Sequence, residues 1–227
     1  MIIKEYDDKF DIKVNKKGGM KFYSADVGKL KFMDSCNMLK GSLSNLATHH
    51  ILNKGDLSIV KATLSTYSTE AQELLCNTGK QFLPYEYIDT MDKLKETSLP
   101  PQEAFYSTLS DSNISLSDYQ HAQKVWQKTG CKTLGDYVNM YLQLDVAFLA
   151  DIYLQWRVVL MELFNLDCLY FLTLASFAIE AMYNKCKVSL DSISDPSLYD
   201  IINRNIRGGF CSVGQRHVIA NNKGYKS

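Results

Sequence analysis

Tyr141 and Asp145 are the residues of this 227-residue chain whose types and spacing most directly suggest chemistry. They lie one helical turn apart in a long stretch with helical periodicity, so both side chains fall on one face of a helix. Phe148 and Ile152 continue that face, which is therefore apolar. A carboxylate on such a face must be paired, hydrogen-bonded or metal-bound. We predict that Asp145 is the functional acid of this helix and that Asp151, on another side, is more readily solvated.

The same two residues also have an ordinary structural interpretation. A tyrosine can pack in a core beside an aspartate that is hydrogen-bonded to a neighbouring helix, and Tyr-x-x-x-Asp occurs by chance in many helical proteins. Metal-dependent chemistry on phosphodiesters uses two divalent cations held by several carboxylates. Asp145 alone cannot assemble such a site, so the spacing by itself leaves both interpretations open.

A second pattern, Ile206-Arg207-Gly208-Gly209, lies near the end of the sequence. Paired glycines let the backbone approach a phosphate closely, and the arginine adds a fork of charged donors. A Gly-Gly turn between two strands is the alternative. The charged residues from position 201 to position 227 are all basic, which suits phosphates or a solvated tail equally. They are Arg204, Arg207, Arg216, Lys223 and Lys226.

Composition narrows the class of protein. The formal net charge is zero, and 46% of residues are hydrophobic and 22% charged, which is ordinary for a globular protein. The six cysteines are scattered without a Cys-x-x-Cys pair, which argues against a zinc site and a disulfide framework. No signal peptide is present, and no apolar run reaches the roughly 20 residues that a membrane span needs. We expect an intracellular protein without a membrane segment.

The elements that would position these residues are a few strands followed by helices. Alternation predicts strands over 10–14 and 20–24 with a turn at 15–19, and a third strand at 30–33. Helical spacing joins Leu39, Leu43 and Leu46. Further helices are predicted from Ser117, as N-cap, to Gln127, from Leu134 to about Leu163 with Thr133 as N-cap, over 173–185, and after Asp195-Pro196.

The residues around Tyr141 and Asp145 carry a resemblance to a known family. Lys132–Tyr137, Tyr141–Val146 and Leu149–Asp151 are similar to the third exonuclease motif region of protein-primed family B DNA polymerases from viruses and virus-like mobile elements. The resemblance implies that Asp145 binds a catalytic metal. It also implies that Tyr141 helps to orient the attacking water and the scissile phosphate.

Two further segments resemble DNA-contacting motifs of that family. Lys31–Ser35 with Leu39 resembles a Ser/Thr-Leu-x-x-hydrophobic motif, which implies that Ser35 contacts the primer end and the priming protein; Cys36 replaces the usual leucine. Ile206–Gly209 resembles the Tyr-x-Gly-Gly motif between exonuclease and polymerase domains, with isoleucine in place of the aromatic residue. This implies that Arg207, Gly208 and Gly209 contact the template. The family's exonuclease lysine has no evident counterpart in the sequence.

The resemblance implies an α/β fold, a partial ribonuclease-H-like 3′–5′ exonuclease domain. Residues 1–190 would be the later part of that domain, and residues 191–227 a linker toward a polymerase palm. The exonuclease Asp-x-Glu motif and the polymerase aspartate motif are absent from the sequence. We therefore expect a fragment that is inactive alone. The intact parent enzyme would use Mg²⁺ or Mn²⁺, and we expect neither to bind this fragment tightly.

The expected partners are DNA, through its primer end and template, and a priming terminal protein. Two alternatives stay open beside the polymerase fragment. One is a non-catalytic module that binds single-stranded DNA through the basic C-terminal segment. The other is a helical interaction protein in which Tyr141 and Asp145 are only core residues.

Overall fold

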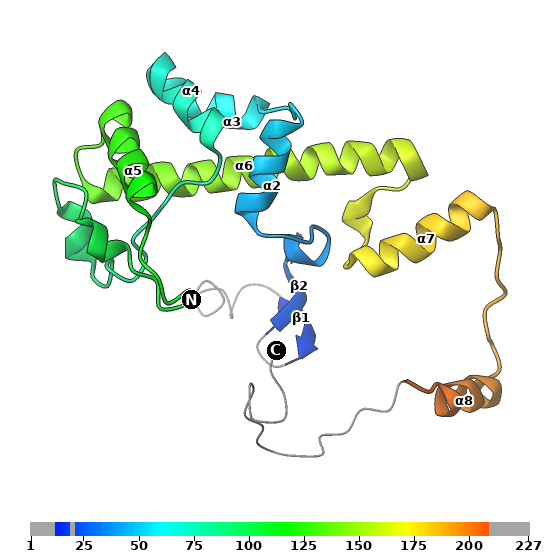
Figure 1. The fold of residues 1–227 in the computed structure, drawn as a ribbon. Helices are drawn as coiled ribbons and strands as arrows, with labels where there is room; N and C mark the ends of the chain where they lie inside the picture. The colour runs from blue at the N-terminus through cyan, green and yellow to red at the C-terminus, as the bar shows by residue number, and fades with distance from the viewer. Residues whose placement is uncertain (1–11, 19–20, 209–227) are drawn as a thin grey trace, which may run out of the picture. The chain divides into compact units, whose positions relative to one another are not determined.

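The computed structural model describes residues 12–18 and 21–208 (Figure 1). The chain divides into two units, Met1–Cys186 and Lys187–Ser227. In the described residues of the first unit, three strands precede a series of helices, and the second unit contributes one helix. This order agrees with the predicted sequence of elements. The ribonuclease-H-like assignment, and the domain division at residue 190, stay predictions.

The strands are β1 (Ile12–Gly18), β2 (Lys21–Val27) and β3 (Leu30–Met33), and they form one antiparallel sheet in the order β1-β2-β3. The predicted hairpin and third strand are confirmed, but the predicted turn is too long. Pairing continues to Gly18 opposite Lys21, with register shifts on either side of Lys16. A bulged strand accommodates the polar run at 15–17 within the sheet.

The longest helix, α6 (Leu134–Phe164), is the centre of the first unit. It packs against α2 and α3 and against the short helix η3. The other α-helices of this unit are α2 (Leu43–Leu52), α3 (Ser58–Thr63), α4 (Thr69–Thr78), α5 (Leu116–Thr129) and α7 (Leu174–Cys186). The 3-10 helices are η1 (Ser35–Asn37), η2 (Leu64–Thr66), η3 (Met91–Lys95), η4 (Gln102–Phe105) and η5 (Cys168–Tyr170).

A smaller hydrophobic cluster joins α6 to α7, and the main hydrophobic core joins α6 to α2, α3, α4 and α5. On α6 it contains Tyr137, Leu144 and Phe148, each at most 1% exposed. Val60 of α3 and Leu75 of α4 are fully buried in the same core. The buried residues of α6 recur at intervals of three and four, which is the periodicity that predicted the helix.

The start of α5 differs from the prediction. The N-cap is Ser115, whose hydroxyl accepts from the backbone N–H of Asp118 at 3.1 Å, and Ser117 already lies inside the helix. Ser115 and Asp118 have the three-residue spacing of a capping box, which explains why the earlier serine starts the helix. The helix extends past the predicted end at Gln127 to Thr129, and Gly130 follows as C-cap with the left-handed φ of 68°.

In the second unit, α8 (Pro196–Asn205) begins as predicted. The Asp195 carboxylate accepts from the backbone N–H of Ser197, and Pro196 occupies the first turn, where a missing N–H costs nothing. Arg204 pairs with Asp200 one turn earlier at 2.7 Å.

Candidate functional site

Tyr141 and Asp145 lie in the first half of α6, and local sequence fixes where that helix begins. The Thr133 side chain accepts from the backbone N–H of Asp136, and the Asp136 carboxylate accepts from the backbone N–H of Thr133. This reciprocal capping box satisfies N–H groups that the first turn leaves without helical partners. The predicted N-cap and helix are confirmed. Tyr141 and Asp145 therefore share a face with one turn between them, as the spacing predicted.

Tyr141 is 1% exposed and its hydroxyl is hydrogen-bonded to that of Tyr85. The two rings meet edge to face, with centroids 6.0 Å apart. Burial, the hydrogen bond to Tyr85 and the negative charge of Asp145 raise the pKa of the Tyr141 phenol well above its ordinary value. Tyr141 is thus a neutral hydroxyl with a fixed ring position, and it can donate a hydrogen bond.

Asp145 is only partly satisfied by its neighbours. Its Oδ2 lies 3.9 Å from Nζ of Lys80, while Oδ1 is buried without a hydrogen-bond partner among the described residues. Burial raises the pKa of the Asp145 carboxyl above 3.8, against the lowering effects of the Tyr141 hydroxyl and the Lys80 charge. The alternative of an aspartate hydrogen-bonded to a neighbouring helix does not describe this geometry. Oδ1 therefore keeps an unused acceptor position.

Lys80 is the site residue that sequence reasoning missed. It follows the end of α4 at Gly79 and lies in a segment without regular secondary structure, with its side chain 32% exposed. No periodicity marks such a segment. The juxtaposition with Asp145 arises from packing between distant parts of the chain, so a local sequence pattern could not indicate it.

The cluster around Asp145 does not form a complete metal centre. The residues that the structure describes contain no group of three or more His, Cys, Asp or Glu side chains placed to hold a metal ion. Divalent cations such as Mg²⁺ prefer several oxygen ligands. A divalent-cation site that included Asp145 would therefore need further oxygen ligands from outside the described residues.

The prediction that Asp151 is more readily solvated than Asp145 is wrong. The Asp151 side chain is buried, at 4% exposure, instead of solvated. Oδ1 accepts from the backbone N–H of Ile59 at 3.0 Å and Oδ2 from that of Val60 at 2.9 Å. Asp151 thereby caps α3, whose own N-cap residue Leu57 makes no side-chain hydrogen bond. The prediction failed because α3 covers this side of α6, which the helical angle alone could not indicate.

Ser35 begins η1 and is half-buried, and its carbonyl accepts from the N–H groups of Met38 and Leu39.

A second segment fits the Ser/Thr-Leu-x-x-hydrophobic pattern in full, with Ser42, Leu43 and Leu46 in the three fixed positions. Ser42 is exposed at the start of α2, where its Oγ accepts from the N–H of Asn45 at 3.2 Å. Its hydroxyl proton remains available to a ligand, and the leucine at the second position was the signal that could have indicated it.

The Arg-Gly-Gly segment follows α8 in the second unit. Arg207 and Gly208 are exposed, and Gly209 lies outside the described residues. A Cβ at Gly208 would meet no atom within 4 Å, and its φ is not in the left-handed region. Packing within the described chain therefore does not require glycine at this position.

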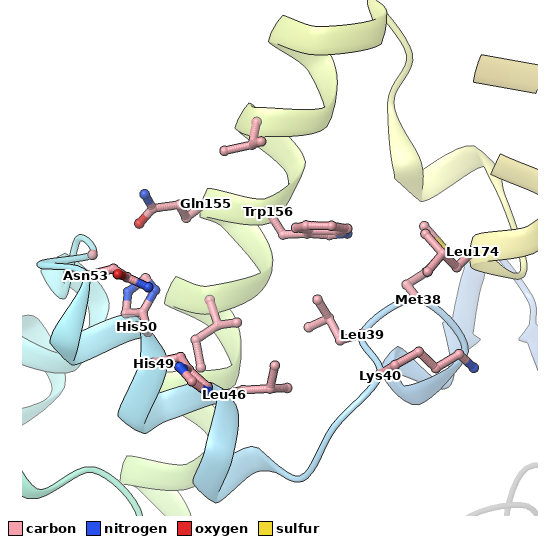
Figure 2. Close-up of a pocket in the computed structure, with 13 residues that line it drawn as sticks. Met38, Leu39, Lys40, Leu46, His49, His50, Asn53, Gln155, Trp156 and Leu174 are labelled. Carbon is pink, nitrogen blue, oxygen red and sulfur yellow. The ribbon is translucent and has the colours of Figure 1, made fainter. Parts of the chain in front are cut away.

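A groove lies farther along α6, with a volume of about 530 Å³. Figure 2 shows Trp156 projecting from α6 toward Met38 and Leu174, with His50 and Asn53 from the end of α2 on the other side. The indole Nε1 of Trp156 is buried without a hydrogen-bond partner in the described part of the chain. Neither Asp145 nor Tyr141 lines this groove.

A protein-family model matches nearly the whole chain. The family described as DNA polymerase type B, organellar and viral, matches residues 2–226. Neither a curated protein nor a solved structure matches the chain. Among the residues described by the structure, helices of the length and apolar character needed to cross a membrane are absent.

Proposed function

Because this chain belongs to the organellar and viral type B DNA polymerases, we propose that it forms the later part of a 3′–5′ exonuclease domain together with the segment that leads to a polymerase domain. Membership in the family implies DNA as the partner. The parent reaction in this proposal is template-directed DNA synthesis with removal of mispaired 3′ ends. The observation that supports it best is the Asp145 carboxylate. Its Oδ1 has no hydrogen-bond partner among the described residues, its Oδ2 lies 3.9 Å from Nζ of Lys80, and the neutral Tyr141 lies one helical turn away.

Each member of this cluster has a distinct role in the proposal. Asp145 supplies one ligand to a divalent cation, Mg²⁺ or Mn²⁺, that further carboxylates from outside the described residues would complete. Tyr141, whose position is fixed by Tyr85, donates a hydrogen bond from its hydroxyl to the attacking water or to a phosphate oxygen at the scissile bond. Lys80 supplies positive charge next to that phosphate, in the role of the family's exonuclease lysine.

DNA contacts outside the cluster complete the proposal. Ser42, or Ser35 in the partial match, contacts the single-stranded primer end, and the same motif would serve a priming terminal protein. Arg207, Gly208 and Gly209 contact the template. The absence of an intramolecular reason for glycine at position 208 supports this role, because a backbone without a side chain leaves room for a phosphate.

The test supplies the missing carboxylates. We would fuse a segment bearing the Asp-x-Glu motif of a related polymerase ahead of residue 1 and follow degradation of 5′-labelled single-stranded DNA with Mn²⁺. The proposal expects 3′–5′ degradation that Asp145→Asn abolishes and that Lys80→Met and Tyr141→Phe reduce. Glu162→Gln is the matched control, because Glu162 is an exposed acid on the same helix. Degradation that survives Asp145→Asn would refute the assignment.

A second candidate function, a non-catalytic DNA-binding module, is supported by the acid-free basic segment from residue 201. It expects the unfused chain to bind single-stranded DNA with an affinity that falls steeply as salt rises and that weakens in Arg207→Ala. The control is Arg204→Ala, since Arg204 is already paired with Asp200. Binding without salt dependence, or no binding, would contradict this function.

A further inference from the structure

The segment that carries Lys80 has no regular secondary structure of its own, so side chains must hold it in place. Residues 79–84 follow α4, and Gly79 turns the chain with a φ of 67°. A lysine on such a segment would ordinarily sample many positions, since its side chain has four rotatable bonds. The contacts that fix this segment matter for function if Lys80 has the role proposed above.

Gln81 is the internal anchor of this segment. Its side chain is buried, at 3% exposure, although it is polar. The amide nitrogen donates to the carbonyl of Gly79 at 2.8 Å and to the hydroxyl of Thr78 at 2.9 Å. These bonds close the backbone around Lys80 into a compact turn, and they leave the amide oxygen of Gln81 to accept from elsewhere.

His121 of α5 provides that donor. Its Nε2 lies 2.8 Å from the amide oxygen of Gln81. Because burial lowers the pKa of His121, the ring is neutral near pH 7, and the tautomer with the proton on Nε2 is the one that can donate here. The ring also meets Phe82 edge to face, with centroids 6.3 Å apart. His121 thus contacts both residues that follow Lys80.

Tyr137 anchors the far side of the segment. Its hydroxyl donates to the carbonyl of Phe82 at 2.8 Å, and its ring is fully buried on α6, one turn before Tyr141. The segment is therefore tied both to α5 and to the helix that carries Asp145. Gln81 and Phe82, the two residues after Lys80, are both fixed by hydrogen bonds, and this restricts the positions that the Lys80 side chain can reach.

We propose that His121 is a positioning residue that, by donating to Gln81, holds Lys80 beside Asp145. Its ring nitrogen does not touch the reacting groups, and its effect is transmitted through the Gln81 side chain and the short backbone turn. A histidine that served only to fill space would be replaced without loss by a ring of similar shape. The N–H donor distinguishes the two roles.

The test measures the proximity of Lys80 and Asp145 directly in the full chain. A carbodiimide activates a carboxylate and allows a neighbouring amine to form an amide with it, so the yield of the Lys80–Asp145 cross-link in mass-mapped peptides reports how long the two groups stay together. The exposed pair Lys95–Asp92, at 2.7 Å, is the internal reference. This measurement does not depend on nuclease activity, so failure of the proposed function and failure of this inference are distinguishable.

We expect His121→Phe, which keeps a ring but removes the donor, to lower the Lys80–Asp145 yield several-fold relative to the reference. His121→Gln, which restores an N–H at similar reach, should recover it, and Gln120→Ala at the exposed neighbouring position should change nothing. If His121→Phe does not unfold cooperatively, Gln81→Met removes the same bond from its other end, together with the bonds to Thr78 and Gly79, and should lower the yield at least as much. An unchanged yield in the donor-less variant, or an equal loss in His121→Gln, overturns the proposal.

Discussion

Replacing Asp151 tests whether a buried carboxylate on α6 holds α3 in place. Asp151→Ala leaves the backbone N–H groups of Ile59 and Val60 without acceptors, in a helix that has no side-chain cap of its own. Leaving a buried N–H group without an acceptor costs about 1–3 kcal/mol for each group. Asp151→Asn keeps one oxygen and loses one charge-assisted bond, so the expected cost is about 1.5–3 kcal/mol.

That loss is a large fraction of the stability of a domain, which is typically about 5–15 kcal/mol. Urea unfolding followed by circular dichroism would show it as a lower transition midpoint with an unchanged slope. Asp145→Asn is the matched comparison on the same helix, because the Asp145 carboxylate has one oxygen without a partner and the other 3.9 Å from its cation. Equal losses in the two Asn variants would refute the reasoning that hydrogen bonding to α3 distinguishes these acids.

Three further predictions concern single side chains. Asp145→Asn should match the wild type in stability at low pH and exceed it increasingly as pH rises from 3.8 to the raised pKa of Asp145. The reason is that a carboxyl whose pKa is higher in the folded protein than in the unfolded chain destabilises the fold when it ionises. A difference in unfolding midpoint that is constant across pH would contradict this. Trp156→Phe removes an indole N–H that has no partner among the described residues, so its free energy of unfolding should change by less than about 1 kcal/mol, and a larger loss would indicate a hidden partner. Thr133→Ala breaks the capping box of α6 and should cost about 1 kcal/mol in thermal unfolding, with an unchanged midpoint counting against the cap.

The predictions that succeeded rest on local signals. Helix α6 was predicted from its N-cap and its periodicity, which act within a few residues of one another. The start of α8 at Pro196 was likewise predicted from two adjacent residues, the N-cap Asp195 and the proline itself. The family resemblance also rested on contiguous segments, and the match over residues 2–226 confirms the type B DNA polymerase family, while protein priming and the exonuclease motif stay predictions. The roles given to Tyr141 and Asp145 stay predictions.

The features that sequence reasoning missed depend on contacts between distant residues. Helix α3 is six residues long and is capped by Asp151, which lies 92 positions after Ile59. No local sequence pattern links Asp151 to the start of α3. The helix was therefore not predicted, and Asp151 was expected to be solvated. Lys80 was not predicted as a site residue for the same reason, because only the packing of distant segments brings it close to Asp145.

The partners of Asp145 differ in how firmly they are held. Tyr141 is on the same helix, so it stays with Asp145 for as long as α6 is intact, whereas Lys80 is attached through side-chain hydrogen bonds of an irregular segment. Segments of that kind open at a lower free energy than a packed central helix. Native-state hydrogen exchange should therefore reveal an order of loss in which the 79–84 segment opens first. In that opened state Asp145 keeps Tyr141 but has lost the positive charge of Lys80, so the charge balance of the cluster is controlled by the least stable element that contributes to it.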